Sequence, residues 1–550
     1  MDGTDLLRAE LKRAAVSLGA PETIEPVLER PRDPSHGDWA TNLAMVLAKP
    51  LGRRPRDLAE SIVERLDKTR AGVKSADVAG PGFINFRLAA DVFAEGLRAL
   101  IAAGDQYGRS TDGQGCAVNV EFVSANPTGP LHVGHGRQAA LGDAISSLLE
   151  ATGWKVTREF YYNDAGAQIM KLADSVQARV RQLGGREAEI PEGGYHGEYI
   201  REVAQRYIDE HSSDPNADDL DAIRRFAVLE LRKEQDRDLQ AFGVKFNIYF
   251  LESSLYSDGR VDAAIQRLID AGHTYEQDGA LWLKTTDFGD DKDRVMRRSA
   301  EKGGEPTYFV PDVAYHITKW ERGFPRAINV QGADHHSTVT RVRIGLQALD
   351  MGIPVGYPDY VLHQMVTVMR GGEEVKISKR AGSYVTVRDL IDEVGRDAVR
   401  YFFLMRKGDS QLVFDVDLAR AQSDENPVYY IQMAHARMSG IFRVGMIDPT
   451  TVTGIGVDLS ELQTPEEREL MKALLDYPNL IKGAAGLLEP HLVANYLLET
   501  AGKIHLWYHK DHVLNEPEPI MQARLVLTRA SQLVLRNGLD LLGISAPERM

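Results

Sequence analysis

The spacing of apolar residues divides the chain into three parts. In the first part, up to about residue 108, apolar positions recur every three or four residues in four segments, and this spacing predicts helices. Two short strands are predicted between the third and fourth helix, and in the second strand Ile84, Phe86 and Leu88 alternate with polar residues. The helices are expected near residues 4–18, 40–49, 56–67 and 90–103. The first part is therefore predicted to be a small α+β domain.

From Cys116 onwards the pattern changes to that of an α/β domain. It predicts a buried strand at 116–124, a long amphipathic helix at about 130–151 and a second strand at 154–162. This order is typical of a doubly wound parallel sheet, in which ligands bind at the carboxyl ends of the strands. Further strands are expected at 280–285, 307–312, 327–334 and 360–368, so that the sheet extends to about residue 370. A glycine-rich stretch near 184–194 and an acidic run at 214–221 are predicted to be insertions.

After Asp397 the apolar spacing becomes helical almost throughout, which predicts an all-α helical bundle. Its helices are expected near residues 426–446, 465–485, 491–510 and 519–543. The predicted domains are thus an N-terminal α+β domain at 1–110, an α/β domain with insertions at 111–410 and a helical domain at 411–550.

Composition and charge limit the cellular compartments and the classes of partner that we expect. The 550 residues are 43% hydrophobic and 26% charged, as in globular proteins, and the single cysteine, Cys116, excludes a disulfide framework and a cysteine-clustered zinc site. The chain starts without a signal-peptide core and has no run of 18 apolar residues, so we expect a cytoplasmic protein without membrane contact. A net charge of −15 weighs only mildly against a nucleic-acid partner, because single-stranded RNA is read largely through base edges and aromatic faces.

A turn from strand to helix is predicted at residues 126–137, Asn-Pro-Thr-Gly-Pro-Leu-His-Val-Gly-His-Gly-Arg. Pro130 suits the first helical turn, and Thr128 or Gly129 suits the cap. The helix is therefore expected to begin just before two histidines.

His132 and His135 are three residues apart, so both imidazoles share one face of the opening turns. A helix N-terminus attracts phosphate, two imidazole donors can stabilise charge on a pentacoordinate α-phosphate, and Gly134 leaves room for a nucleotide. The stretch Gly134-x-Gly-x-x-Ala139, with Glu159 ending the next strand, also fits a dinucleotide fingerprint. We disfavour that alternative because a loop of about eight residues precedes the first glycine and the histidines would have no role. A purely structural histidine pair is the other alternative.

A second cluster, from Gly371 to Gly382, places Lys376, Lys379 and Arg380 within five residues. Flanking glycines indicate a mobile loop, whose cations can close over a triphosphate and neutralise a departing pyrophosphate. Alone, such a run is more often a solvated basic turn. The pattern GxxxxGK[ST] does not occur, which excludes a Walker-type site.

Together the two clusters resemble the HIGH and KMSKS signatures of class I aminoacyl-tRNA synthetases, as His132-Val-Gly-His135 and Lys376-Ile-Ser-Lys379-Arg380. More of the chain is similar to arginyl-tRNA synthetases in particular. The matching stretches are 36–42, 80–85, 124–127, 162–168, 430–437 and 549–550. They span nearly the whole length.

The resemblance implies a Rossmann-type catalytic domain that joins L-arginine to tRNA(Arg), using ATP with Mg²⁺ and no protein metal site. The arginine carboxylate attacks the α-phosphate, pyrophosphate leaves, and the terminal 2′-OH of the tRNA takes the aminoacyl group. His132 and His135 would stabilise the transition state, and Lys376 and Lys379 would hold the pyrophosphate. The implied ATP contacts are His132, Gly134, His135, Gly332, Asp334, Lys376, Ser378 and Lys379.

The resemblance also implies contacts to the amino acid and to tRNA. Asn126 would bind the α-amino end of arginine, and carboxylates suit its planar guanidinium because they accept paired hydrogen bonds. The implied guanidinium contacts are Glu252, Tyr308 and Asp312, and the implied tRNA contacts are Phe83 and Asn85 in the N-terminal domain and Tyr430 and Met550 in a helical anticodon-binding domain. We expect a monomer.

Three other functions stay open. Another class I synthetase is the nearest, although one cysteine cannot build the zinc site usual for cysteine specificity, and 550 residues hardly hold a large editing insertion. A nucleotidyltransferase with an HxGH motif would have no use for the terminal helical domain. A catalytically silent RNA-binding paralogue conflicts with the intact histidine and lysine signatures.

Overall fold

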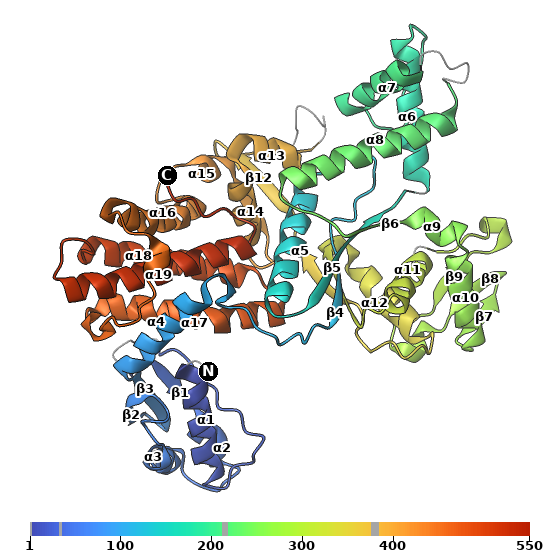
Figure 1. The fold of residues 1–550 in the computed structure, drawn as a ribbon. Coiled ribbons are helices and arrows are strands. Elements are labelled where there is room, and N and C mark those ends of the chain that lie inside the picture. The colour runs from blue at the N-terminus through green and yellow to red at the C-terminus, as the bar shows by residue number, and fades with distance from the viewer. Residues whose placement is uncertain are drawn as a thin grey trace.

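The chain folds into an elongated molecule in the computed structural model, with a central α/β layer between a helical bundle and smaller outlying modules (Figure 1). A small N-terminal module lies beneath the bundle, and three helices project from the other side of the central layer. The structure describes residues 3–31, 33, 36–164, 166–211, 218–307, 309–375 and 384–550.

The N-terminal module contains a three-stranded antiparallel sheet in the order β1-β3-β2. Ile84, Phe86 and Leu88 are buried along β3, as their alternation predicts. The helix predicted at 40–49 is wrong at its start, because residues 39–41 pair with β3 and sheet pairing overrides the local helical spacing. The elements are α1 (Gly3–Val16), β1 (Trp39–Thr41), α2 (Leu43–Ala48), α3 (Pro55–Arg65), β2 (Val73–Ala79), β3 (Phe83–Leu88) and α4 (Ala90–Ala103).

The central sheet has five parallel strands in the order β11-β10-β4-β5-β6, which confirms a doubly wound α/β fold. The first strand of the series, β4, has β5 on one side and β10 on the other, so the strand order reverses between β4 and β10. Ligands of such sheets bind at this switch point. The elements are β4 (Ala117–Glu121), α5 (Val133–Ala151), β5 (Lys155–Tyr162), β6 (Ile248–Leu251), α11 (Phe309–Glu321), β10 (Arg326–Gly332), α12 (His336–Gln347) and β11 (Asp359–His363).

The strand predicted at 307–312 is wrong, because the chain is helical from Phe309 onwards. Pro311 fits the first helical turn, and Phe309 and Val310 are apolar because they pack into a buried cluster rather than along a sheet. The segment 280–285 does contain a strand, but in a separate antiparallel sheet, β7-β8-β9. The elements of this module are α9 (Glu252–Ser257), α10 (Arg260–Asp270), β7 (Thr274–Gln277), β8 (Ala280–Leu283) and β9 (Arg294–Arg297).

The segment predicted as one strand at 360–368 splits between two sheets. The strand β11 ends the central sheet at His363, not at 370, and β12 joins a small sheet in the order β13-β12-β14. Its strand β14 follows the central domain in sequence and pairs in parallel with β12; the domain boundaries themselves stay predictions. The elements are β12 (Val366–Arg370), β13 (Glu373–Glu374), α13 (Val387–Val394), α14 (Arg396–Leu404), β14 (Leu412–Asp415) and α15 (Val416–Arg420).

Three helices between β5 and β6 form a projecting unit, termed the inserted arm (Figure 1). The arm has a hydrophobic cluster of its own, to which each helix contributes. The glycine-rich stretch at 184–194 lies between its first two helices, and the acidic run at 214–221 falls mostly outside the described residues. The helices are α6 (Ala167–Leu183), α7 (Glu198–His211) and α8 (Leu220–Ala241).

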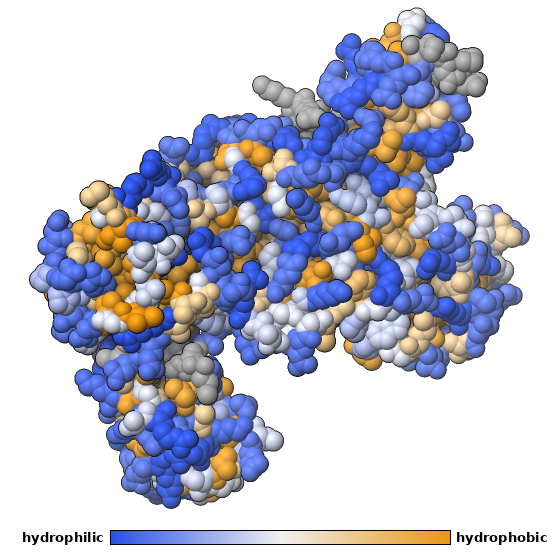
Figure 2. All heavy atoms as spheres, in the orientation of Figure 1, coloured by the Kyte–Doolittle hydropathy of each residue, from blue (hydrophilic) through white to orange (hydrophobic). Residues whose placement is uncertain are grey.

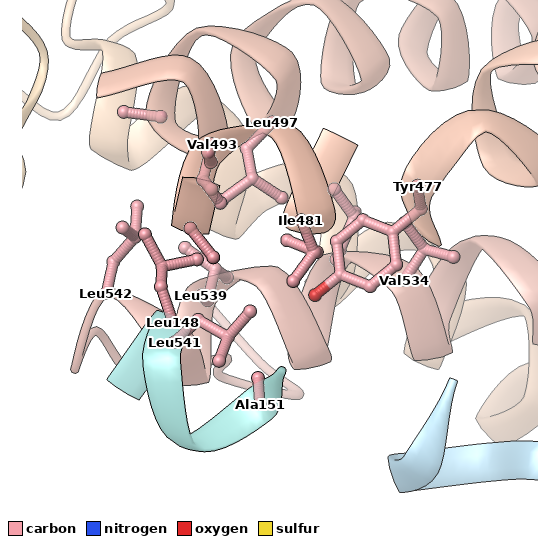
Figure 3. Packing of buried hydrophobic residues seen from close by; sticks show 14 of the residues in the cluster. Leu148, Ala151, Tyr477, Ile481, Val493, Leu497, Val534, Leu539, Leu541 and Leu542 are labelled. Atoms are coloured by element: carbon pink, nitrogen blue, oxygen red, sulfur yellow. The ribbon is translucent and has the colours of Figure 1, made fainter. Parts of the chain in front are cut away.

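The four helices predicted near the C-terminus are confirmed within three residues at each end and form a bundle. Figure 3 shows residues of these helices packed against Leu148 and Ala151 of α5, so the bundle shares its core with the central α/β domain. Apolar side chains also gather over the bundle on the face in Figure 2. No helix among the described residues is long and apolar enough to cross a membrane. The helices are α16 (Pro427–Gly445), α17 (Pro465–Leu487), α18 (His491–Lys510) and α19 (Glu518–Leu541).

One buried arginine joins the bundle to α5 of the central domain. The guanidinium of Arg400 pairs with Asp143 of α5 at 2.6 Å and donates to the carbonyls of Leu542 at 2.8 Å and Phe242 at 3.1 Å. The side chain is fully buried. These three contacts fix the end of α19, the end of α8 and the middle of α5 relative to one another.

A buried carboxylate attaches the N-terminal module to the bundle. Asp38 pairs with Arg468 at 2.6 Å and with Lys472 at 2.7 Å, both on α17, and it also accepts from the backbone N of Leu88 at 2.7 Å. Burial alone would raise the pKa of Asp38, but the hydrogen bonds from these cations and from the amide hold it below its usual value. The ionised carboxylate therefore stabilises the contact between the two modules.

Replacing Asp38 with Ala is expected to lower the free energy of unfolding by about 3 kcal/mol, because two cations lose their buried partner. Since the native pKa of Asp38 is lowered, the loss should be present at neutral pH and shrink as the pH falls through that pKa. Urea unfolding of the parent and the variant at neutral and acidic pH measures this loss in the free energy of unfolding. Asp77→Ala, which removes an exposed carboxylate of the same module, is the control; equal urea midpoints for both variants at neutral pH would contradict the assignment.

Candidate active site

The helix α5 begins at the carboxyl edge of the central sheet, and its cap is His132. The ring Nδ1 accepts hydrogen bonds from the backbone N of Gly134 at 3.0 Å and of His135 at 3.3 Å. The predicted helix start at Pro130, with its cap at one of the two residues before it, is wrong, because the imidazole of His132 satisfies these amides. Since Nδ1 accepts, the neutral ring carries its proton on Nε2.

The two histidines of the first motif lie against each other. Their rings stack with centroids 3.6 Å apart and an angle of 19° between planes. Burial lowers the pKa of both rings, and the neighbouring His132 and His363 lower that of His135 further, so both are neutral at pH 7. Among the described residues, no group hydrogen-bonds to the buried Nδ1 of His135. A phosphate oxygen beside this ring would remove that cost, so the pair fits a bound nucleotide.

The neighbouring strand β10 places Gly332 and Asp334 at the same edge of the sheet. A Cβ at position 332 would lie 2.4 Å from Oδ1 of Asp334, so the glycine leaves the space that this carboxylate occupies. Burial lowers the pKa of His132, and the nearby charge of Asp334 partly opposes that effect. The structure therefore brings these two predicted residues to the histidine pair.

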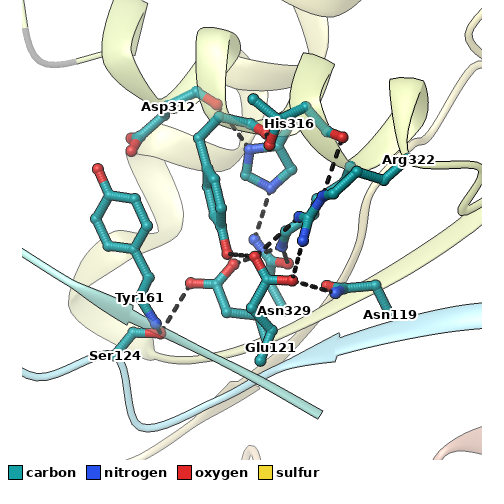
Figure 4. Close-up of polar contacts among 12 residues, drawn as sticks. Asn119, Glu121, Ser124, Tyr161, Asp312, His316, Arg322 and Asn329 are labelled. Carbon is teal, nitrogen blue, oxygen red and sulfur yellow. Dashed lines mark hydrogen bonds and ion pairs between the residues drawn. The ribbon is translucent and has the colours of Figure 1, made fainter. Parts of the chain in front are cut away.

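Two of the predicted guanidinium contacts, Glu252 and Asp312, lie near Glu121 and Tyr161 in an acidic cluster, termed the acidic pocket. Figure 4 shows its members Asp312, Glu121 and Tyr161. Burial raises the pKa of Asp312 to about 7, and the charges of Glu121 and Glu252 contribute to the rise. Burial also raises the pKa of Glu252 to about 7, despite a hydrogen bond from the Tyr161 hydroxyl. Carboxylates that resist ionisation in this way favour a cationic ligand.

A buried lysine holds the floor of this pocket in place. Nζ of Lys319 lies 2.6 Å from Glu121 and 3.0 Å from Oδ1 of Asn329, and its side chain is completely buried. The amide of Asn329 donates to Nε2 of His316 at 2.8 Å, and Nδ1 of that ring lies 2.7 Å from the carbonyl of Asp312 (Figure 4). Burial lowers the pKa of His316 to about 3, so the ring is neutral. The pocket thus rests on a rigid polar network.

Comparison with known proteins identifies the family. Residues 97–421 match the model described as tRNA synthetases class I (R), catalytic domain, residues 4–88 match the arginyl tRNA synthetase N terminal domain, and residues 431–550 match the DALR anticodon binding domain. The Arginine–tRNA ligase of Geotalea daltonii is 57% identical over 97% of this chain and 96% of its own length. That of Thiobacillus denitrificans is 55% identical over 99% of this chain and 98% of its own length. The chain belongs to the arginyl-tRNA synthetase family.

Solved structures show the same fold. The arginyl-tRNA synthetase of Thermus thermophilus is 24% identical, with a TM-score of 0.76 over 99% of this chain and 100% of that one. A methionyl-tRNA synthetase of Mycobacterium tuberculosis, in complex with methionyl-adenylate, is 14% identical, with a TM-score of 0.53 over 79% of this chain and 92% of that one. At these identities the likeness concerns the fold alone, and it agrees with the class I catalytic domain of arginyl-tRNA synthetases.

The other predicted site residues of this arginyl-tRNA synthetase family member lie in three places. Phe83 and Asn85 lie on β3 of the N-terminal module, where Phe83 is exposed, and Met550 is exposed at the C-terminus. Tyr430, on α16, packs against His505 with ring centroids 4.2 Å apart. Asn126 lies in the loop between β4 and α5. The predicted residues outside the described part of the chain are Lys376, Ser378, Lys379 and Tyr308.

Sequence reasoning gave no role to Glu121, Tyr161 or Asp164, although Asp164 lies in a stretch similar to arginyl-tRNA synthetases. The carboxylate of Asp164 accepts from the backbone N of Ser253 at 2.9 Å and from its hydroxyl at 2.8 Å. These bonds fix the start of α9, whose first residue is Glu252. A polar residue directly after a predicted strand was the available signal.

Replacing Asp312 with Asn is expected to stabilise the ligand-free protein at pH 8 by about 2 kcal/mol. Because burial raises the native pKa of Asp312 to about 7, the native state binds more protons than the unfolded state above pH 4, and stability falls as the pH rises to 7. Urea unfolding at pH 8 and pH 4 measures the effect, which should nearly vanish at pH 4. Asp262→Asn changes an exposed carboxylate of the adjacent module and serves as control; destabilisation by Asp312→Asn at pH 8 would refute the explanation.

Proposed function

We propose that this chain is an arginine–tRNA ligase, which activates L-arginine with ATP and transfers it to tRNA(Arg). The observation that carries the proposal is the pair of half-buried carboxylates with raised pKa values, Glu252 and Asp312, in a chain that belongs to the arginyl-tRNA synthetase family. A guanidinium remains charged and offers a planar fork of N–H donors, which two carboxylates can accept together. With Tyr308, these residues select arginine over lysine, whose ammonium is a single point charge.

The histidine pair and the strand end beside it bind ATP. Nε2–H of His132 and the unpaired Nδ1 of His135 donate to the α-phosphate as charge builds there, and Gly134 leaves room for the nucleotide. Gly332 and Asp334 bind the ribose. Lys376, Ser378 and Lys379 hold the pyrophosphate. Mg²⁺ arrives on the ATP phosphates, whose charge it neutralises.

The reaction has two steps. A carboxylate oxygen of arginine attacks the α-phosphorus and the bond to pyrophosphate breaks, which gives arginyl-adenylate. The terminal 2′-OH of the tRNA then attacks the arginyl carbonyl, loses its proton, and AMP leaves. Asn126 orients the substrate by its α-amino end throughout.

The tRNA is bound outside the catalytic domain as well. Phe83 and Asn85 contact it from the N-terminal module, and Tyr430 and Met550 contact the anticodon region from the bundle. The exposure of Phe83 and Met550 supports this assignment, since an apolar side chain in water gains from stacking on a base. That the enzyme is a monomer in the cytoplasm stays a prediction.

Arginine attachment to tRNA tests the proposal directly. Asp312→Asn is expected to raise KM for arginine about 100-fold, because one charge-assisted pair of hydrogen bonds is lost, while kcat changes little. His135→Ala is expected to lower kcat by about 100-fold with KM for arginine nearly unchanged, because its donor acts on the transition state. Attachment of lysine or glutamate in place of arginine would reject the pocket assignment, and equal KM effects of the two variants would reject the division of roles.

The affinity for arginine is also expected to depend on pH. The guanidinium stays charged, whereas Glu252 and Asp312, with pKa values raised to about 7, must release protons to pair with it. KM for arginine should therefore fall as the pH rises from about 6 to about 8, and less steeply in Asp312→Asn. KM for ATP is the internal control, because burial lowers the pKa of both histidines and so favours their neutral forms. A constant KM for arginine would contradict the raised pKa values.

A further inference from the structure

Each helix of the inserted arm hydrogen-bonds to the loop between β4 and α5. From α6, Gln168 accepts from the side-chain amide of Asn126 at 2.5 Å. From α7, the hydroxyl of Tyr199 donates to the carbonyl of Thr128 at 3.0 Å. From α8, Nε2 of Gln235 donates to the carbonyls of Asn126 at 3.0 Å and Gly129 at 2.8 Å. The arm therefore holds the backbone of residues 126–129 and one side chain.

The contact between arm and loop is tight. Gln235 is only 1% exposed, so its two hydrogen bonds are shielded from water. A Cβ at position 129 would lie 3.0 Å from the hydroxyls of both Tyr199 and Tyr384, so Gly129 permits the close approach. An ion pair also attaches the arm to the central domain, because Asp238 of α8 lies 3.0 Å from Arg388 of α13.

The histidine that follows the loop is anchored separately. The backbone N of Val133 donates to the carbonyl of Val385 at 3.2 Å, and that of Val387 donates to the carbonyl of Leu131 at 2.9 Å. These bonds place His132 in a β-bridge with Thr386. The arm thus holds residues 126–129, whereas the segment before α13 holds residues 131–133.

We propose that the inserted arm is the positioning element for the α-amino end of arginine, with Gln235 as its positioning residue; this rests on the proposed function. Gln168 accepts from Nδ2 of Asn126, which leaves Oδ1 of Asn126 as the acceptor that an α-ammonium requires. Gln235 fixes the backbone from which that amide extends. Because the nucleotide site has its own anchor, the arm acts on the amino acid and not on ATP.

The test is steady-state aminoacylation with arginine and ATP varied in turn. Gln235→Leu keeps the volume and removes two hydrogen bonds, so KM for arginine should rise at least tenfold, while KM for ATP stays within about twofold. Tyr199→Phe should raise KM for arginine by about fivefold, because one bond is lost. Gln177→Leu is the matched control, since this glutamine of α6 bonds within the arm, to the carbonyl of Asp218 at 2.8 Å. It should leave both KM values unchanged.

A second pair of variants keeps the proposal testable if Gln235→Leu fails to fold. Gln168→Glu retains an acceptor for Asn126 and should keep the KM for arginine near that of the parent, whereas Gln168→Leu should raise it. Equal rises in KM for arginine and ATP, or a Gln168→Glu variant as weak as Gln168→Leu, would overturn the proposal. A parent protein that attaches no arginine would instead reject the proposed function, so the two failures are distinguishable.

Discussion

Negative charge buried beside the central sheet is the constraint on which the candidate site depends. Partial burial raises the pKa of Asp312 and of Glu252 to about 7, and nearby charges add to the rise, those of Glu121 and Glu252 at Asp312 and that of Asp164 at Glu252. Asp312 lies in the first turn of α11, where the helix dipole favours an anion, and Lys319 of the same helix supplies the buried cation for Glu121. The helix α11 therefore supplies both the carboxylate of Asp312 and the cation that pairs with Glu121. The contacts of Lys319 with Glu121 and Asn329 hold α11 against the sheet, and this offsets the cost of placing carboxylates there.

At the start of α5, one side chain has two roles. His132 uses Nδ1 to cap the helix and keeps its Nε2 proton for the nucleotide, so the same ring serves the fold and the proposed chemistry. Its stacking on His135 and its bridge to Thr386 set the ring's direction before any ligand arrives. Donors fixed in this way need no reorganisation as charge develops, which is the condition for efficient electrostatic stabilisation.

The elements that the sequence predicted well are those whose apolar period comes from local packing. The bundle helices and the strand–helix–strand unit at 116–162 repeat their period over many residues, so the signal is strong. The strand predicted at 307–312 is wrong because the apolar residues of a buried first helical turn have the same local pattern as a short strand. The cap at His132 was missed because side-chain caps from imidazole are unusual.

Within the candidate site, the motif residues could be predicted and their supports could not. Asp164 and Ser253 are 89 residues apart, and Gln235 and Asn126 are 109 apart. No local pattern links such pairs, since only the crossing of the sheet connections brings them together. The resemblance implies which residues would touch substrate, whereas the residues that hold them in place are recognisable only in the folded structure.

The attachment of the N-terminal module has a consequence for how the chain is made. The ion pair that compensates the burial of Asp38 can form only after Arg468, 430 residues further along the chain, has been synthesised. At ribosomal synthesis speeds that interval lasts roughly 20 to 90 seconds, during which the docking face stays in water. The N-terminal module is thus synthesised long before the helix α17 against which it packs.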